Sequence, residues 1–262
     1  MTNKYIISKF ENEIRRAAND FKQRLEQQRF FQVQNKLLKK LHEEVKIIGY
    51  CNSKEIRELS LEYEDFYRKL SESGRTYENI VEEKNLIDTY SAFEKFLFDC
   101  FYSIYDCFPK FLGDKVSVNI YDLFIDENVL LCKKNIIELK VKNLIQSNNI
   151  ITILSEFKKG FSIKTIDDCI SDNEKNILCE LSLVRNLVIH NNGVVNRIHI
   201  EQIKKFLKEN VKYSFREGET VFNKLGDLVQ DLKDISTVTC ERLTDAIIDD
   251  SIRLQKYHED KG

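Results

Sequence analysis

The sequence predicts a mainly α-helical fold, and three observations support that prediction. One proline and eight glycines in 262 residues are too few for a multi-stranded protein joined by tight turns. Apolar residues recur at three- and four-residue spacing over long stretches, as they do on one face of a helix. The composition, 42% hydrophobic and 32% charged, is typical of a globular chain whose helices have solvated outer faces.

The amino-terminal part of the chain is predicted to form a helical hairpin. Apolar spacing predicts one helix over residues 3–48, capped by Gly49, and a second over 52–70. Small polar residues and a fresh helix start follow, so we place a domain boundary there. The hairpin then occupies 1–74 and a larger helical domain 75–262. We expect the hairpin either to pack on that domain or to bind a partner.

The larger domain is predicted to be a helical bundle. Pro109, Gly160 and Asn192-Gly193 supply natural ends for three of its helices. Residues 211–222 alternate apolar and polar side chains around a glycine, which predicts one short β-hairpin. The predicted helices span 76–108, 126–146, 150–159, 172–191, 198–210 and 225–257.

Charge, cysteine usage and hydropathy exclude several functions. The net charge of −2 provides no global basic field, so any RNA binding must be local. Seven cysteines without a C-x-x-C pair predict buried reduced thiols rather than a disulfide or zinc framework. The absence of a P-loop, a G-x-G-x-x-G loop, an H-E-x-x-H helix and a serine elbow argues against nucleotide hydrolysis, dinucleotide redox chemistry, zinc proteolysis and serine hydrolysis. Without a long apolar run, we expect a cytoplasmic protein that has no membrane contact.

The segment 176–193 is unusual because Glu180 and Arg185 are its only charged residues, with His taken as neutral. A helix that is uncharged on both sides is usually buried on both sides. We therefore expect a second packing partner there, most simply the same helix of a twofold-related protomer. The predicted core stripe is Ile177, Leu181, Val184 and Val188, and the opposite face holds Cys179, Leu183, Asn186 and His190.

Within this segment, Arg185-Asn186 and His190-Asn191-Asn192-Gly193 resemble the R-x(4–6)-H motif of HEPN (higher eukaryotes and prokaryotes nucleotide-binding) ribonucleases. The spacing alone is weak, because Arg253 and His258 match it too, in a charged terminus. The specific residues lie within 185–196, whereas the helical layout extends the resemblance over roughly 77–257. The amino-terminal hairpin lies outside it.

The resemblance implies a HEPN-like helical bundle and a metal-independent endoribonuclease that needs no cofactor. RNA carries its own nucleophile, the 2′-OH, so the protein need only move protons and stabilise charge. Arg185 and His190 are then the catalytic residues, and Asn186 supports the imidazole. RNA, with tRNA among the candidates, is the expected substrate, and a homodimer through 176–193 the expected assembly. The resemblance also implies a role in toxin or anti-phage systems, in which an antitoxin or sensor protein is a possible partner.

Glu94 is the next candidate site residue. It interrupts the apolar stripe of the predicted helix over 76–108, and a carboxylate there must find a partner or become neutral. HEPN proteins often place an acidic residue on an early helix, so the resemblance implies that Glu94 orients Arg185. A position at the rim of the stripe, facing solvent, is the alternative.

Other readings of the same residues stay open. Arg185 and His190 could be a hydrogen-bonding pair inside a bundle, or line the groove of a non-catalytic HEPN-like module that binds nucleotide, RNA or protein. A purely structural adaptor would cover the Asn186–His190 face with helices of the same chain. Lys158-Lys159 and Lys204-Lys205 either contact RNA phosphates or face solvent, and His42 and His199 are expected at the surface.

Overall fold

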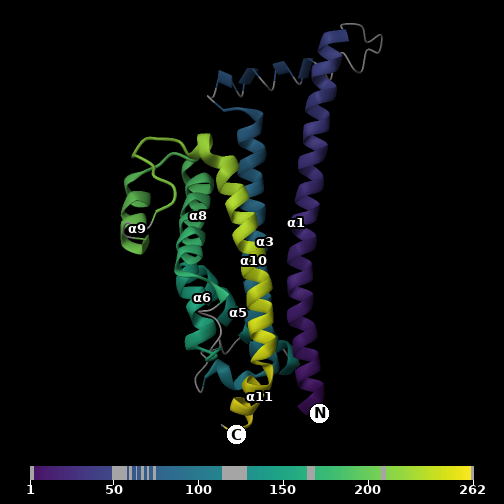
Figure 1. The fold of residues 1–262 in the computed structure, drawn as a ribbon, viewed down its shortest axis with the longest axis vertical. Helices are drawn as coiled ribbons and strands as arrows, with labels where there is room; N and C mark the ends of the chain where they lie inside the picture. The colour runs from purple at the N-terminus through teal and green to yellow at the C-terminus, as the bar shows by residue number, and fades with distance from the viewer. Residues whose placement is uncertain are drawn as a thin grey trace.

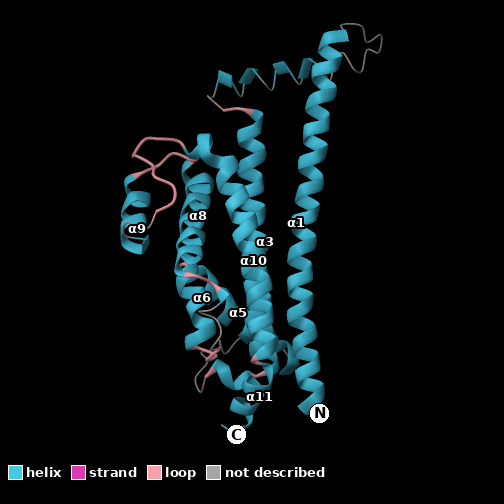
Figure 2. Cartoon of the chain, viewed as in Figure 1, coloured by secondary structure: helices cyan, strands magenta, loops and turns pink. Residues whose placement is uncertain are grey.

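The computed structural model describes residues 3–48, 75–113, 129–163, 169–207 and 211–260, together with isolated residues between 58 and 72. Over these residues the chain forms helices and no strand, so the predicted all-α class is confirmed (Figure 2). The predicted helix over 3–48 is present. Its Gly49 cap lies outside the described residues, as does most of the predicted helix over 52–70.

Three long helices form the centre of the molecule (Figure 1): α1 (Asn3–Ile48), α3 (Tyr77–Cys107) and α10 (Leu225–Asp249). Both α3 and α10 pack against α1 and against each other. The far end of α1 extends beyond the tops of α3 and α10 (Figure 1). Both chain termini lie at the opposite end of the bundle.

Most of the remaining helices lie on the side of α3 and α10 that faces away from α1, whereas α11 also contacts α1 (Figure 1). Among them, α8 contacts α3 and α10 on one side and α6 and α9 on the others. The element bounds are η1 (Pro109–Leu112), α5 (Val129–Ser147), α6 (Ile150–Lys159), α8 (Asp172–Asn191), α9 (Arg197–Leu207), η2 (Val221–Lys224) and α11 (Ser251–Asp260).

Aromatic side chains from distant parts of the sequence form one core. Phe10 and Phe108 meet edge to face with their ring centroids 5.0 Å apart, which joins α1 to the end of α3. The rings of Phe101 and Phe157 stack at 4.3 Å, which joins α3 to α6. The first half of α1 therefore shares its core with residues 75–262. The buried side chains of α1 are Phe10, Ile14, Ala17, Ala18 and Phe21.

Two sequence predictions differ from the structure. The single helix predicted over 225–257 is divided at Asp250 into α10 and α11. The β-hairpin predicted over 211–222 does not form, since these residues contain no strand. Instead, the segment pairs with the residues that follow α8, through one antiparallel bridge between Val194 and Thr220. Its alternating pattern arises because Tyr213 and Val221 turn into the core, not because its two halves pair with each other.

The described cysteines agree with the prediction of reduced thiols. Cys100, Cys179 and Cys240 form no disulfide with the described residues and are buried among apolar side chains. Burial raises the pKa of the Cys179 thiol to about 11 and that of Cys240 to about 12, so both stay protonated and unreactive. None of the described helices is long and apolar enough to span a membrane.

Candidate functional site

Local sequence signals fix the start of α8, the helix that carries the candidate site. The Ser171 hydroxyl accepts a hydrogen bond from the Glu174 backbone N–H at 3.2 Å. The Glu174 carboxylate accepts one from the Ser171 backbone N–H at 2.8 Å. This reciprocal capping box satisfies two of the N–H groups that a helix start leaves without partners.

The end of α8 is fixed as firmly. Asn192 is left-handed, with φ 49°, and Gly193 has φ 69°, as the sequence Asn-Gly predicts. The Gly193 N–H donates to the Leu187 carbonyl at 3.0 Å. A Cβ atom on Gly193 would lie 2.8 Å from the Phe222 ring, so this position requires glycine for space as well as for φ. His190 is thereby placed in the last turn of the helix.

The two faces of α8 differ in how well they are covered. The predicted core stripe is confirmed, because Ile177, Leu181, Val184 and Val188 are all buried. On the opposite face, Cys179 and Leu183 are buried within this chain, so this half of the face is covered without a second protomer. Cys179 lies close to Tyr90 of α3, so this part of the face packs against a helix of the same chain. Asn186 and His190, in the other half, are exposed.

Arg185 contacts residues of two helices. Its Nη2 atom lies 3.8 Å from Oε2 of Glu94 on α3, and its Nη1 donates to Asn186 Oδ1 at 3.2 Å. The guanidinium carbon lies 5.6 Å from the centre of the Tyr90 ring, within the range of a cation–π contact. Glu94 therefore does meet Arg185, and its side chain is 30% exposed, neither fully buried nor free in solvent.

Burial controls the electrostatics of this cluster. It raises the pKa of the Glu94 carboxyl, while the Arg185 guanidinium acts in the opposite direction. Burial raises the pKa of Tyr90, and the Glu94 charge raises it further. The phenol beside the guanidinium therefore stays protonated and uncharged. Arg185 Nε is shielded and has no hydrogen-bond partner among the described residues. At 3.8 Å the contact with Glu94 is an ion pair and not a hydrogen bond, so guanidinium donors remain available.

His190 lies five residues beyond Arg185 on the same helix. Among the described residues, no hydrogen bond or ion pair joins it to Arg185 or to any other group. It is exposed and lies in the last turn of the helix. Exposed apolar side chains surround this end of α8: Ile189 is 40% exposed, Val194 36% and Ile198 64%.

Sequence reasoning missed two residues that shape the site. Tyr90 lies under the guanidinium and shares a hydrogen bond with Ser182 of α8, but on α3 its ring is indistinguishable from a core residue. Glu180 is buried and accepts backbone N–H groups of Lys212 at 2.9 Å and Tyr213 at 2.7 Å, which holds the 211–220 loop against α8. The sequence signal that could have identified Glu180 is that it is the only carboxylate in the otherwise nearly uncharged segment 176–193.

The other candidate residues have mixed outcomes. His199 is buried, and burial lowers its pKa to about 4, so the surface position expected for it is wrong. The apolar face of α9 turns inward at this residue. The Lys158-Lys159 and Lys204-Lys205 pairs are exposed at the ends of α6 and α9. The side chain of His42 lies outside the described residues.

One cluster among the described residues has metal-ligand character: Glu13, Asp106 and Cys107. Asp106 already pairs with Lys9 and Lys133, each at 2.8 Å, so ammonium groups occupy the positions that a cation would take. This cluster lies at the carboxyl end of α3, roughly 18 Å along the helix from Glu94. It is separate from the Arg185 cluster.

The chain was also compared with known proteins. No family model, curated protein or solved structure matches it.

Proposed function

We propose that this chain is a metal-independent endoribonuclease that cleaves RNA by 2′-OH transphosphorylation, with Arg185 and His190 as its catalytic residues. One observation carries the proposal. The partly exposed guanidinium of Arg185 is held by Glu94, Asn186 and Tyr90, while His190 is exposed five residues further along the same helix.

The chemistry needs only proton transfers and charge stabilisation. The 2′ oxygen of RNA attacks the adjacent phosphorus as the P–O5′ bond breaks, giving a 2′,3′-cyclic phosphate and a 5′-hydroxyl end. A proton leaves the 2′-OH and another reaches the departing 5′ oxygen. A histidine suits either transfer, and general acid–base catalysis of this kind contributes about 10²–10⁴-fold. The Arg185 guanidinium would stabilise the charge that develops on the phosphate oxygens.

Glu94 and Asn186 would act on Arg185 as positioning residues. Each engages a different terminal nitrogen of the guanidinium, which restrains its plane. The Tyr90 ring makes a cation–π contact with the same guanidinium and restrains it further. An arginine fixed in this way loses less side-chain entropy when it binds phosphate, so more of the interaction can favour the transition state.

The site we propose is composite, formed by two copies of α8 across a twofold axis. Residues five apart on a helix point roughly 140° from each other, which is unfavourable for both side chains to reach one phosphate. Asn186, Ile189 and His190 are exposed within the single chain, so this half of α8 is free to meet a second copy. His190 of the partner subunit would then supply the second proton transfer.

Incubation with total RNA and with purified tRNA in the presence of EDTA tests the proposal. Wild-type protein is expected to leave 2′,3′-cyclic phosphate ends, and His190→Ala and Arg185→Ala are expected to lose at least about 100-fold in rate. His258→Ala, which alters the histidine of the second R-x4-H match, is the matched control and should cleave normally. Cleavage by His190→Ala at the wild-type rate would refute the assignment.

The alternative is a non-catalytic module that binds RNA, nucleotide or protein through the same face. The ion pair between Arg185 and Glu94 favours it, because it partly neutralises the guanidinium. In that case folded wild-type protein retards RNA or captures a partner, depending on Arg185, but leaves no cyclic-phosphate ends. Light scattering and circular dichroism establish that the proteins compared have the same assembly and fold.

The cellular role that goes with this activity is a toxin or anti-phage effector. Induced expression of the wild type in a bacterial host, alone or under phage infection, should then arrest growth, and His190→Ala should not. Any antitoxin or sensor partner should suppress or trigger the arrest. Unimpaired growth with wild-type protein under every infection tested would count against this role.

A further inference from the structure

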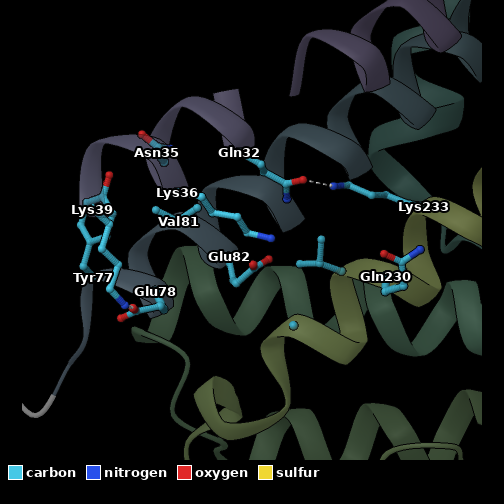
Figure 3. A pocket seen from close by; sticks show the side chains of 12 residues that line it. Gln32, Asn35, Lys36, Lys39, Tyr77, Glu78, Val81, Glu82, Gln230 and Lys233 are labelled. Atoms are coloured by element: carbon cyan, nitrogen blue, oxygen red, sulfur yellow. Dashed lines mark hydrogen bonds and ion pairs between the residues drawn. The ribbon is translucent and has the colours of Figure 1, made fainter. Parts of the chain in front are cut away.

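A second site lies on the other side of the bundle from α8. A pocket of about 340 Å³ opens between α1, α3 and α10 (Figure 3). This volume is at the small end of the range for ligand-binding cavities. Because α3 and α10 lie between α1 and α8, the pocket is separate from the Arg185 cluster (Figure 1).

Two lysines in the pocket form no ion pair at contact distance with the described residues, although the Glu82 carboxylate also lines the pocket. Lys36 of α1 and Lys233 of α10 enter it from opposite sides, the Lys36 amine on the side of Glu82 and the Lys233 amine towards Gln32 (Figure 3). Lys233 Nζ donates to Gln32 Oε1 at 3.2 Å, and no ion pair joins either lysine to the described residues. The third lysine, Lys39, is already paired with Glu78.

The charge on Lys233 is unfavourable in the empty pocket. Burial lowers its pKa. The Glu82 and Asp234 carboxylates oppose this without cancelling it, and the Lys36 charge adds a smaller lowering effect. A partly buried ammonium without an ion-pair partner is stabilised by a bound anion. Phosphate oxygens can accept hydrogen bonds from both amines at once.

The rest of the lining fits the body of an organic molecule. Side-chain amides of Gln32, Asn35 and Gln230 provide donors and acceptors, and Val81 and Val229 provide apolar surface. An additional Cβ on Gly226 would have no heavy atom within 4 Å, so this edge of the pocket is open. Amides and apolar walls are the groups that recognise a base or a sugar, whereas inorganic phosphate needs only charge.

We propose that this pocket binds a nucleoside monophosphate, with its phosphate between Lys36 and Lys233 and its body against the amides and valines. The site is independent of the ribonuclease proposal, since none of its residues belongs to the Arg185 cluster. It joins three helices, so an occupying ligand would hold α1 more firmly to α3 and α10 and raise the melting temperature.

Isothermal titration calorimetry and thermal melting with AMP, GMP, CMP and UMP test the proposal. At least one nucleotide should bind the wild type more tightly than adenosine or inorganic phosphate does, and should raise Tm. Lys36→Gln and Lys233→Gln should each weaken binding at least about tenfold. Lys40→Gln, which changes an exposed lysine of α1 one turn beyond Lys36 and outside the pocket lining, is the matched control and should bind within about twofold of wild type. Arg185→Ala should bind normally.

Melting curves in phosphate-free buffer establish that each variant is folded before binding is compared. The proposal is overturned if no nucleotide binds the wild type, if inorganic phosphate or adenosine binds as tightly as the nucleotide, or if Lys36→Gln/Lys233→Gln binds as well as Lys40→Gln. Failure of RNA cleavage in the α8 variants has no bearing on these outcomes.

Discussion

The Arg185 guanidinium and the Glu94 carboxylate lie 3.8 Å apart across the contact between α8 and α3. Both side chains are partly shielded, at 23% and 30% exposed, so solvent screens the pair less than a surface ion pair. Because burial raises the pKa of Glu94, acidification neutralises this carboxyl at a higher pH than an ordinary glutamate. The orientation of Arg185 therefore depends on the charge of Glu94, and burial disfavours the charged form of that carboxyl.

Glu94→Gln tests the positioning role. It should lower kcat for RNA cleavage by about 10- to 100-fold with little change in KM, because a misplaced guanidinium weakens transition-state binding. The free energy of unfolding should change by no more than about 1 kcal/mol. Asp88→Asn, which removes the exposed Lys84–Asp88 pair of the same helix, should leave kcat unchanged. A wild-type kcat in Glu94→Gln would leave Glu94 with a structural role only.

A charge at Ile189 tests the composite site. If two copies of α8 meet at this face, Ile189→Arg should convert a dimer to a monomer in light scattering and abolish cleavage, while the melting temperature of the monomer stays similar. Ile252→Arg, which changes another exposed isoleucine on α11, should leave the assembly intact. Wild-type protein that is monomeric at all concentrations, yet cleaves RNA, would refute the composite site.

Gly193→Ala should destabilise the fold by about 1–3 kcal/mol, because alanine must adopt φ 69° and its Cβ would press on Phe222. Gly226→Ala is the control, since this helical glycine has open space around it and should be neutral or stabilising by up to about 1 kcal/mol. Urea unfolding measures both. Equal midpoints for the two variants would show that the turn after α8 tolerates a side chain.

His199 should make the fold sensitive to acid. Its folded pKa of about 4 lies below the ordinary value of 6.5, so between these values the unfolded chain binds the additional proton. Its contribution is complete above pH 6.5 and is lost as the pH falls towards 4, by about 3 kcal/mol in all. Burial raises the Glu180 pKa to about 6, which acts in the opposite direction between pH 6 and 4.5.

Urea unfolding of wild type and His199→Gln from pH 7 to pH 4 separates the two groups, because Glu180 is common to both proteins. The stability difference between them should move in favour of the variant as the pH falls. A difference that stays constant over this range would mean that His199 titrates normally in the folded protein.

The limits of the helices were largely predictable from the sequence because the signals that set them are local. The Thr76 capping box starts α3, the Ser171 box starts α8, and Asn192-Gly193 ends it. Each involves residues within four or five positions of one another. The core stripe of α8 was predictable for the same reason, since helical periodicity places every fourth residue on one face.

The division between α10 and α11 and the conformation of 211–222 were not predictable in this way. An alternating pattern shows which side chains turn inward, but it does not identify the partner of the backbone. Here the backbone of 218–221 pairs with 193–195, and the Glu180 carboxylate takes the N–H groups of Lys212 and Tyr213. These partners come from another part of the chain.

The sequence by itself determined the fold class, most of the helix limits and the placement of Arg185, Asn186 and His190 along one uncharged helix. Only the tertiary structure decided that Glu94 and Tyr90 contact Arg185, that His199 is buried, and that Asn186 and His190 are exposed while Cys179 and Leu183 are covered. The physical reason is the sequence separation over which each interaction acts. Caps and periodicity act within a few residues, whereas contacts between helices depend on how whole faces pack.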